Sequence, residues 1–297
     1  MRPPRFRGAV RRLLLVPRVN ASLRPALEQI WEHGLRKDYL CGCGTAFSSC
    51  PFWSSVGKSV WDEDPHRVGE RAEELQRRWV RNFRIPRLAK EGVRATDDEL
   101  REHGELLARL YETIREVAGT RYVIDSTKSP AYGHLLARVA GIELFVIHLI
   151  RDSRAVAYSW TRPKARLETA DGRLMRAKRP LRGAVEWSIR NAWACTLRNP
   201  ARGYVRVWYE DLARDPESTL TETLGQLGLQ RAETATRRQA PHTVGGNPIR
   251  FVPEPPRVRL DERWRTEAPF RQRMLVTLLT WPLLVAWRAP RRSGVAR

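Results

Sequence analysis

The residues best placed to do chemistry are Arg151 and Ser159, which follow a mostly apolar run over residues 142–150 (Ile-Glu-Leu-Phe-Val-Ile-His-Leu-Ile). Such a run is typical of a buried strand, and the charged turn after it indicates the start of a helix. In open α/β sheets, ligands bind beyond the carboxyl ends of the strands, where the first amides of the next helix meet a phosphate. Because Ser159 lies about two helical turns after Arg151, its hydroxyl and the guanidinium can share one oxyanion. The spacing therefore predicts an anion-binding site.

Three further segments carry polar residues after strand-like or glycine-rich runs. They are Tyr122-Val-Ile-Asp-Ser-Thr-Lys-Ser-Pro130, Tyr209-Glu-Asp-Leu212 with Asp215-Pro216, and His242-Thr-Val-Gly-Gly-Asn-Pro-Ile-Arg-Phe251 with Asp261-Glu-Arg-Trp264. Together with the Arg-x7-Ser segment, and in this order, they resemble sulfotransferases that use 3′-phosphoadenosine 5′-phosphosulfate (PAPS). The resemblance runs from about Leu27 to the last helix.

The resemblance implies a catalytic role for Lys128. Sulfuryl transfer, like phosphoryl transfer, needs fixed cations that neutralise charge on the equatorial and leaving oxygens. Lys128 lies three residues after the end of its strand, so its ammonium can reach the sulfuryl group or the bridging oxygen. The alternative is a solvated lysine or a partner for Asp125.

The same resemblance implies a set of residues that bind PAPS. Arg151 and Ser159 would hold the 3′-phosphate, and Tyr209 would contact the 3′-phosphoadenosine end. The alternatives are a helix-start salt bridge for Arg151 and a core tyrosine for Tyr209. Glycines at 245 and 246 would let the backbone approach the nucleotide beside Asn247, and Arg250 would close over it, with an ordinary tight turn as the alternative. No metal is expected in this chemistry.

The expected fold class is α/β: a parallel sheet flanked by helices, in the P-loop NTPase-like fold of sulfotransferases. Family members begin with a strand and a Gly-x-x-Arg-Ser-Gly-Thr-like loop that holds the 5′-phosphosulfate, and residues 1–24 contain no such loop. We therefore expect this first strand-loop unit to be missing or divergent. Residues 1–26 would be a divergent basic N-terminus that can be disordered, and residues 27–297 would form the sulfotransferase-like domain. A misassigned start, a frameshifted beginning and real divergence would each explain this.

Alternating strand and helix patterns predict parallel strands with right-handed crossovers. We expect a basic loop over residues 163–182 and an ordered loop over residues 240–260. The expected strands are residues 121–125, 142–150 and 204–209. The expected helices are residues 67–84, 97–118, 130–140, 153–161 and 183–199, one from Asp215-Pro216 to about 227, and a last one from about 263.

The formal charge of +21 attracts polyanions of any sequence. Only six of the 54 basic residues are lysine, however, and the basic residues are scattered through every segment. We therefore expect no specific nucleic-acid partner, and a basic nucleic-acid-binding protein stays the alternative outside the family. The expected acceptor is a hydroxyl or amine of a small molecule, carbohydrate or lipid. The alternative within the family is a remnant that only binds the nucleotide, and none of these motifs specifies an oligomeric state.

No stretch reaches the 18 or more apolar residues that span a bilayer, so we expect no transmembrane segment and a cytoplasmic protein. The nearest stretch, residues 274–287, contains Pro282 and predicts a terminal helix broken by proline.

Three of the four cysteines, Cys41, Cys43 and Cys50, lie within ten residues. Their C-x-C-x6-C spacing matches no standard zinc knuckle, although His33 is available as a fourth ligand. A zinc site, a redox-labile pair and a glycine-punctuated turn with small buried side chains remain open.

Overall fold

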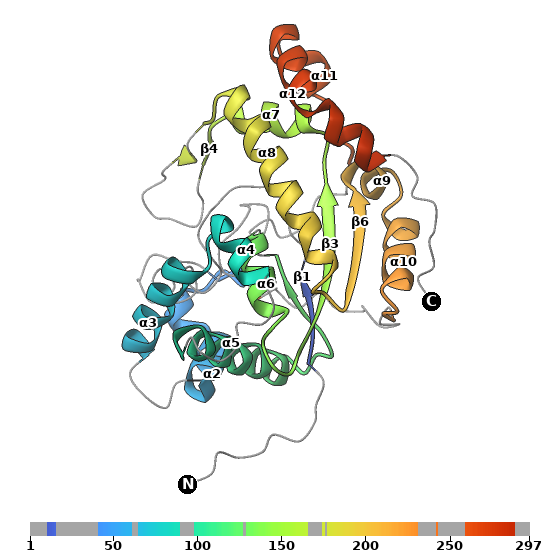
Figure 1. The fold of residues 1–297 in the computed structure, drawn as a ribbon. Helices are drawn as coiled ribbons and strands as arrows, with labels where there is room; N and C mark the ends of the chain where they lie inside the picture. The colour runs from blue at the N-terminus through green and yellow to red at the C-terminus, as the bar shows by residue number, and fades with distance from the viewer. Residues whose placement is uncertain are drawn as a thin grey trace.

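The computed structural model describes residues 11–15, 41–60, 65–89, 98–126, 129–165, 174–175, 177–230, 242 and 259–288. They form a mixed α/β structure, mostly helical, around a small parallel sheet (Figure 1). The expected α/β class with a parallel sheet is confirmed.

In the described part of the chain, the sheet has four parallel strands in the order β2-β1-β3-β6. Their bounds are Arg11–Leu15 for β1, Val123–Asp125 for β2, Ile142–Ile150 for β3 and Gly203–Trp208 for β6.

A strand near the start of the chain excludes one of the expected alternatives, that the first strand is missing. β1 lies inside the sheet, where Leu14 pairs with Ile124 of β2 on one side and with Phe145 of β3 on the other. The loop expected after it lies outside the described residues, so its divergence stays a prediction. Five residues that begin with two arginines have little strand signal of their own, and pairing with two distant strands defines this one.

The order of the strands reverses at β1. The chain passes from β1 to β2 on one side and then crosses to β3 on the other side of β1. In such sheets the crevice outside the carboxyl ends of the strands, at the point of reversal, is the usual ligand site. Arg151 directly follows β3 at this point.

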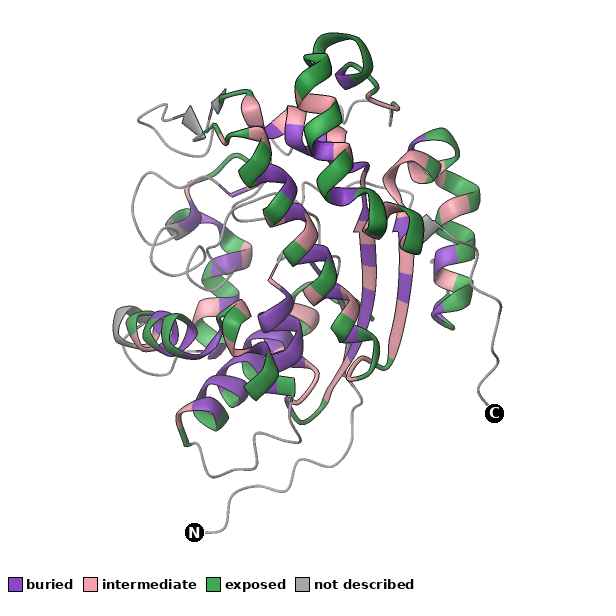
Figure 2. Ribbon diagram, turned by 45° about the horizontal axis from the view of Figure 1, so that its top comes forward, coloured by how far each residue is buried: buried purple, intermediate pink, exposed green. Residues whose placement is uncertain are grey.

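Helices cover both faces of the sheet. On β3, Leu144 and Val146 pack with the helices that precede this strand in the sequence. Phe145, Ile147 and Leu149 pack with the helices that follow β6. Neither β3 nor β6 has an exposed residue (Figure 2). Burial on both faces explains why residues 142–150 are mostly apolar and do not alternate regularly with polar residues.

Most helices lie where the sequence predicts them. Pro51–Val60 is α2, Pro65–Trp79 is α3, Ile85–Ala89 is α4, Asp98–Val117 is α5, Pro130–Leu136 is α6, Ser153–Thr161 is α7, Pro180–Cys195 is α8, Tyr209–Arg214 is α9, Pro216–Gln226 is α10, Trp264–Glu267 is α11 and Phe270–Arg288 is α12. Short 3₁₀ turns cover Phe47–Ser49, Asn82–Arg84 and Thr196–Arg198. Tyr209 begins α9 instead of ending a strand. The expected loop over residues 163–182 contains a small antiparallel pair, β4 (Lys164–Ala165) and β5 (Leu174–Met175).

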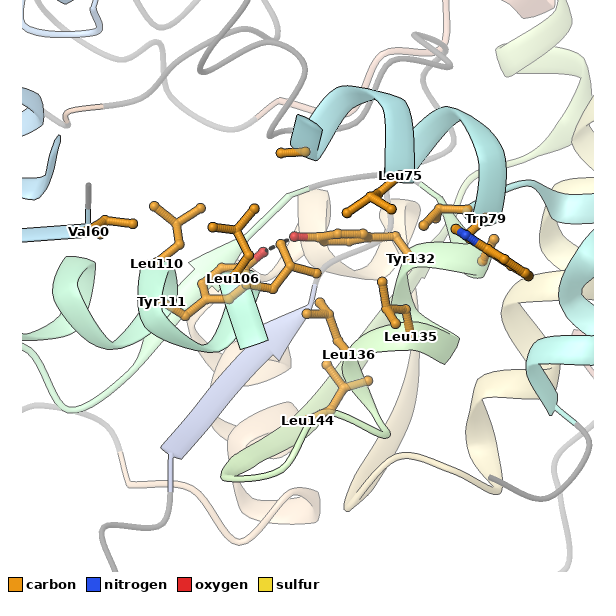
Figure 3. Close-up of a cluster of buried hydrophobic side chains, with 14 of the residues drawn as sticks. Val60, Leu75, Trp79, Leu106, Leu110, Tyr111, Tyr132, Leu135, Leu136 and Leu144 are labelled. Carbon is orange, nitrogen blue, oxygen red and sulfur yellow. Dashed lines mark hydrogen bonds between the residues drawn. The ribbon is translucent and has the colours of Figure 1, made fainter. Parts of the chain in front are cut away.

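The largest buried cluster joins the helices before β2 to α6. Leu75, Leu107, Leu136 and other apolar side chains pack around Tyr111 and Tyr132, whose hydroxyls are 2.8 Å apart (Figure 3). The Tyr111 hydroxyl also donates to the buried carboxylate of Asp125 at the carboxyl end of β2. The packing thereby connects the helices before β2 to the carboxyl end of β2.

The last helix corrects another expectation. α12 continues through Pro282 without a break. Val276 on one face is buried in the core, whereas Leu278 and Trp281 are exposed. Among the helices that the structure describes, none is long and apolar enough to cross a membrane.

Candidate functional site

Arg151 is fixed through its backbone as well as its side chain. Its carbonyl oxygen accepts a hydrogen bond of 3.0 Å from Nε1 of Trp187, which is completely buried on α8. Asp152 follows as the N-cap of α7 and accepts from the backbone N–H of Arg154. The turn between β3 and α7 therefore has a defined backbone, as the sequence predicts.

The guanidinium of Arg151 contacts residues from two distant parts of the chain. Its carbon Cζ lies 4.5 Å from the ring centroid of Tyr209, at the carboxyl end of β6. Its Nη2 lies 3.2 Å from both the backbone oxygen and Oδ2 of Asp261. Among the described residues, Nε of Arg151 is buried and has no hydrogen-bond partner. A cation with an unsatisfied donor suits an additional anionic acceptor.

The segment before α11 crosses this edge of the sheet. Tyr209 donates its hydroxyl to the carbonyl oxygen of Arg259 at 3.1 Å, and Asp261 pairs with Arg263 as well as with Arg151. Hydrogen bonds from Arg263 and then from Arg151 hold the pKa of Asp261 well below its usual range. Asp261 is therefore a permanent counter-ion of Arg151 at neutral pH.

Glu210 connects the ends of β3 and β6. Its Oε1 accepts a hydrogen bond of 3.0 Å from the backbone N–H of Asp152. Asp152 in turn binds the guanidinium of Arg154, which stacks on the ring of Trp264. The two strand ends are thus joined by a charge-assisted hydrogen bond, and a cation–π contact adds α11.

The structure brings together some of the expected site residues. Arg151 and Tyr209 are in contact at the point of strand reversal. Ser159 is half-buried on α7, and its pairing with Arg151 stays a prediction. Three of the expected residues lie outside the described part of the chain: Lys128, Asn247 and Arg250.

Two buried histidines have a structural role. His148 on β3 lies between the hydroxyl of Tyr204 (2.6 Å) and Oδ1 of Asn191 (2.8 Å), and His134 pairs with Thr196 at 2.7 Å. Burial lowers the pKa of each imidazole to about 4. Both are neutral at pH 7 and enclosed by protein, so neither is suited to take a proton from an acceptor.

A second group of reactive side chains lies at the start of α2. The Sγ atoms of Cys41, Cys43 and Cys50 and a ring nitrogen of His242 all lie within 4.8 Å of one another. The fourth member is His242, whereas His33 lies outside the described residues.

Several of these partners are far from each other in the sequence. Asp261 lies 110 residues from Arg151, and His242 lies 192 residues from Cys50. The Asp-Glu-Arg-Trp segment and the histidine that begins the glycine-rich segment were the available signals. Neither the ion pair nor the Cys/His group can be recognised without tertiary contacts.

Two sulfotransferase domains are among the solved structures that are distantly similar to this chain. The sulfotransferase domain from the Synechococcus PCC 7002 olefin synthase aligns with a TM-score of 0.35 and 18% identity, over 95% of this chain and 98% of the other. The sulfotransferase domain from the curacin biosynthetic pathway aligns with a TM-score of 0.41 and 16% identity, over 94% and 99%. The sequence matches no family model, and no curated protein is detectably similar to it.

Proposed function

We propose that this chain is a sulfotransferase that moves a sulfuryl group from PAPS to a hydroxyl or amine of a small-molecule, carbohydrate or lipid acceptor. The observation that carries the proposal is the position of Arg151. It directly follows a central strand at the point where the strand order reverses, and its Nε lacks a partner among the described residues. The order of the four sequence motifs supports the same activity.

In this reaction the bond between sulfur and the 5′-phosphate oxygen would break as a bond from sulfur to the acceptor forms, the acceptor would lose its proton, and 3′-phosphoadenosine 5′-phosphate would leave. Arg151 and Ser159 would bind the 3′-phosphate, with Tyr209 restricting the guanidinium from one side. Lys128, three residues after Asp125 of β2, would neutralise charge on the bridging oxygen. Asn247 and Arg250 would close over the nucleotide.

Residues 16–22 follow β1 in the sequence, and they contain Arg18 and no glycine. Glycine lets backbone amides approach an anion without a Cβ in the way, so a segment without glycine depends more on a side-chain cation for binding the 5′ end of the donor. We propose Arg18 for this role.

Calorimetric titration with 3′-phosphoadenosine 5′-phosphate tests the proposal. We expect micromolar binding that Arg151→Ala weakens by at least about tenfold, because a charge-assisted hydrogen bond contributes about 1.5–3 kcal/mol. Arg18→Ala should also weaken binding. Arg214→Ala is the control: it removes the same charge from an exposed residue of α9.

The two alternative functions predict different outcomes of the binding experiments. Binding without turnover of PAPS in the presence of candidate acceptors would indicate the nucleotide-binding remnant. DNA binding that falls steeply with salt and is unchanged by Arg151→Ala would favour a nucleic-acid-binding protein. Equal nucleotide affinity in wild type, Arg151→Ala and Arg214→Ala would contradict the proposed site.

A further inference from the structure

The group formed by Cys41, Cys43, Cys50 and His242 has the composition of a metal site. Three sulfur atoms and one imidazole nitrogen lie within 4.8 Å of one another. Cys41 and Cys50 are completely buried, and Cys43 and His242 are partly exposed. Thiolate and imidazole are soft to borderline ligands, which suit zinc rather than magnesium or calcium.

The distances between these atoms fit the edges of a tetrahedron. Zinc binds sulfur at about 2.3 Å and nitrogen at about 2.0–2.1 Å, which separates neighbouring sulfurs by about 3.8 Å and sulfur from nitrogen by about 3.6 Å. The Sγ of Cys50 lies 3.7 Å from that of Cys41 and 3.8 Å from that of Cys43. Nδ1 of His242 lies 3.3 Å from Sγ of Cys50 and 3.7 Å from Sγ of Cys41.

The local backbone arranges the cysteines. Cys41 donates its N–H to the carbonyl of Thr45, and Gly44 donates to the carbonyl of Cys41, which closes a tight turn. Gly44 has a φ of 89°, a left-handed conformation that favours glycine. The turn brings Cys43 toward Cys50, which directly precedes α2.

The histidine is oriented by an aromatic side chain. The ring of His242 stacks on Phe52, the second residue of α2, with centroids 4.7 Å apart and planes 5° from parallel. This packing directs Nδ1 toward the cysteines, although His242 is far away in the sequence. An oriented imidazole is what a metal site requires of a histidine ligand.

Two other arrangements fit less well. A disulfide needs sulfur atoms about 2.05 Å apart and would use only two of the four groups. An iron–sulfur cluster places inorganic sulfide and several irons between its ligands, so its four protein ligands do not all lie so close together. A mononuclear tetrahedral ion uses all four side chains.

We propose that Cys41, Cys43, Cys50 and His242 bind one Zn²⁺ in a closed, structural site. Four protein ligands leave no position for water or substrate, which separates this site from catalytic zinc. The ion would connect His242 to the cysteines that precede α2. The proposal does not depend on the activity of the protein.

The experiment is metal analysis of the full chain purified without chelator. We expect one zinc per chain by inductively coupled plasma mass spectrometry, and release of that zinc to a colorimetric chelator when the thiols are modified with a mercurial. Cys43→Ser and His242→Ala should each lower the zinc content to less than half. Cys195→Ser is the matched control, because Cys195 lies outside the group on α8 and should leave the zinc content unchanged.

Cobalt gives a second measurement that does not depend on variants folding well. Wild-type protein loaded with Co²⁺ should show sulfur-to-cobalt charge-transfer bands and the strong visible bands of tetrahedral cobalt. Wild-type protein without zinc and without these bands would overturn the proposal. A disulfide among these cysteines in fresh protein, bound iron with acid-labile sulfide, or equal zinc in the wild type and in the Cys43→Ser/His242→Ala double variant would also overturn it.

Discussion

Arg151 is held at three points before any ligand binds. Trp187 binds its carbonyl oxygen, Tyr209 packs against its guanidinium, and Asp261 neutralises its charge. The Arg151 and Asp261 side chains are partly exposed, at 23% and 32%, so the ion pair contributes little net stability in itself. Its main effect is orientation, since a cation that is already positioned loses less entropy when it binds an anion.

The free energy of unfolding should depend on pH, and part of this dependence can be assigned to His148. Burial lowers its pKa from 6.5 to about 4, so between these values the unfolded chain binds a proton that the folded chain does not. The stability that the neutral imidazole contributes is present above pH 6.5 and is lost as the pH falls toward 4. For this single group, the expected loss between pH 7.5 and pH 5 is about 2 kcal/mol.

Urea unfolding of the wild type and of His148→Gln at these two pH values measures this loss. Glutamine cannot titrate, so the variant should lose about 2 kcal/mol less of its unfolding free energy on acidification than the wild type. His103 and His134 also have lowered pKa values, and they contribute equally to both proteins. Identical pH dependence in the two proteins would exclude His148 as a source.

At the scale of elements, β6 packs so closely on β3 that its first residue has to be glycine. A Cβ at Gly203 would lie 2.9 Å from Cδ1 of Phe145 and 3.0 Å from Cδ2 of Leu227. Phe145 is buried directly opposite Gly203 in the ladder, so its ring has little room to move. The close approach, and not an unusual backbone conformation, accounts for the glycine.

Gly203→Ala should therefore destabilise the protein by about 1–3 kcal/mol, as expected for overpacking. Gly225→Ala is the matched control, because nothing lies within 4 Å of a Cβ at that position of α10. Alanine is favoured over glycine in a helix by about 0.5–1 kcal/mol, so the control should be neutral or slightly stabilising. Thermal unfolding of both variants tests the prediction, and equal stability would contradict the close packing.

The sequence predicted β3, α7 and the start of α10 more accurately than it predicted the start of the chain. The bounds of β3 and α7 agree with the expected ones, and α10 begins after its Asp215 cap as expected. These elements carry local signals: a long apolar run, an acidic N-cap and a proline in the first turn. β1 has no comparable signal and was missed.

On the scale of the whole molecule, the proposed zinc would connect segments that are far apart in the sequence. Cys50 precedes the helices that form the largest buried cluster, and His242 lies only five residues before Asn247 and eight before Arg250. Metal binding stabilises the folded state because the unfolded chain has no preformed site. The ion would thus affect both the stability and the segment expected to close over the nucleotide.

Removal of the metal should accordingly lower the melting temperature by at least about 5 °C, which corresponds to a loss of a few kcal/mol in a protein of this size. It should also weaken binding of 3′-phosphoadenosine 5′-phosphate, a result that rests on both proposals. Differential scanning calorimetry and titration before and after treatment with a chelator measure the two effects, and re-addition of zinc should reverse them. An unchanged melting temperature after confirmed zinc loss would show that the ion has no structural role.

The sequence by itself determined the class of fold and the position of Arg151, because the length, periodicity and capping of β3 and α7 are local properties of the chain. Only the tertiary structure decided that β1 lies between β2 and β3, that Asp261 neutralises Arg151, and that His242 joins the three cysteines. Each of these depends on contacts between residues separated by about a hundred positions or more. Such contacts follow from how elements pack, and the packing leaves no periodic pattern in the sequence.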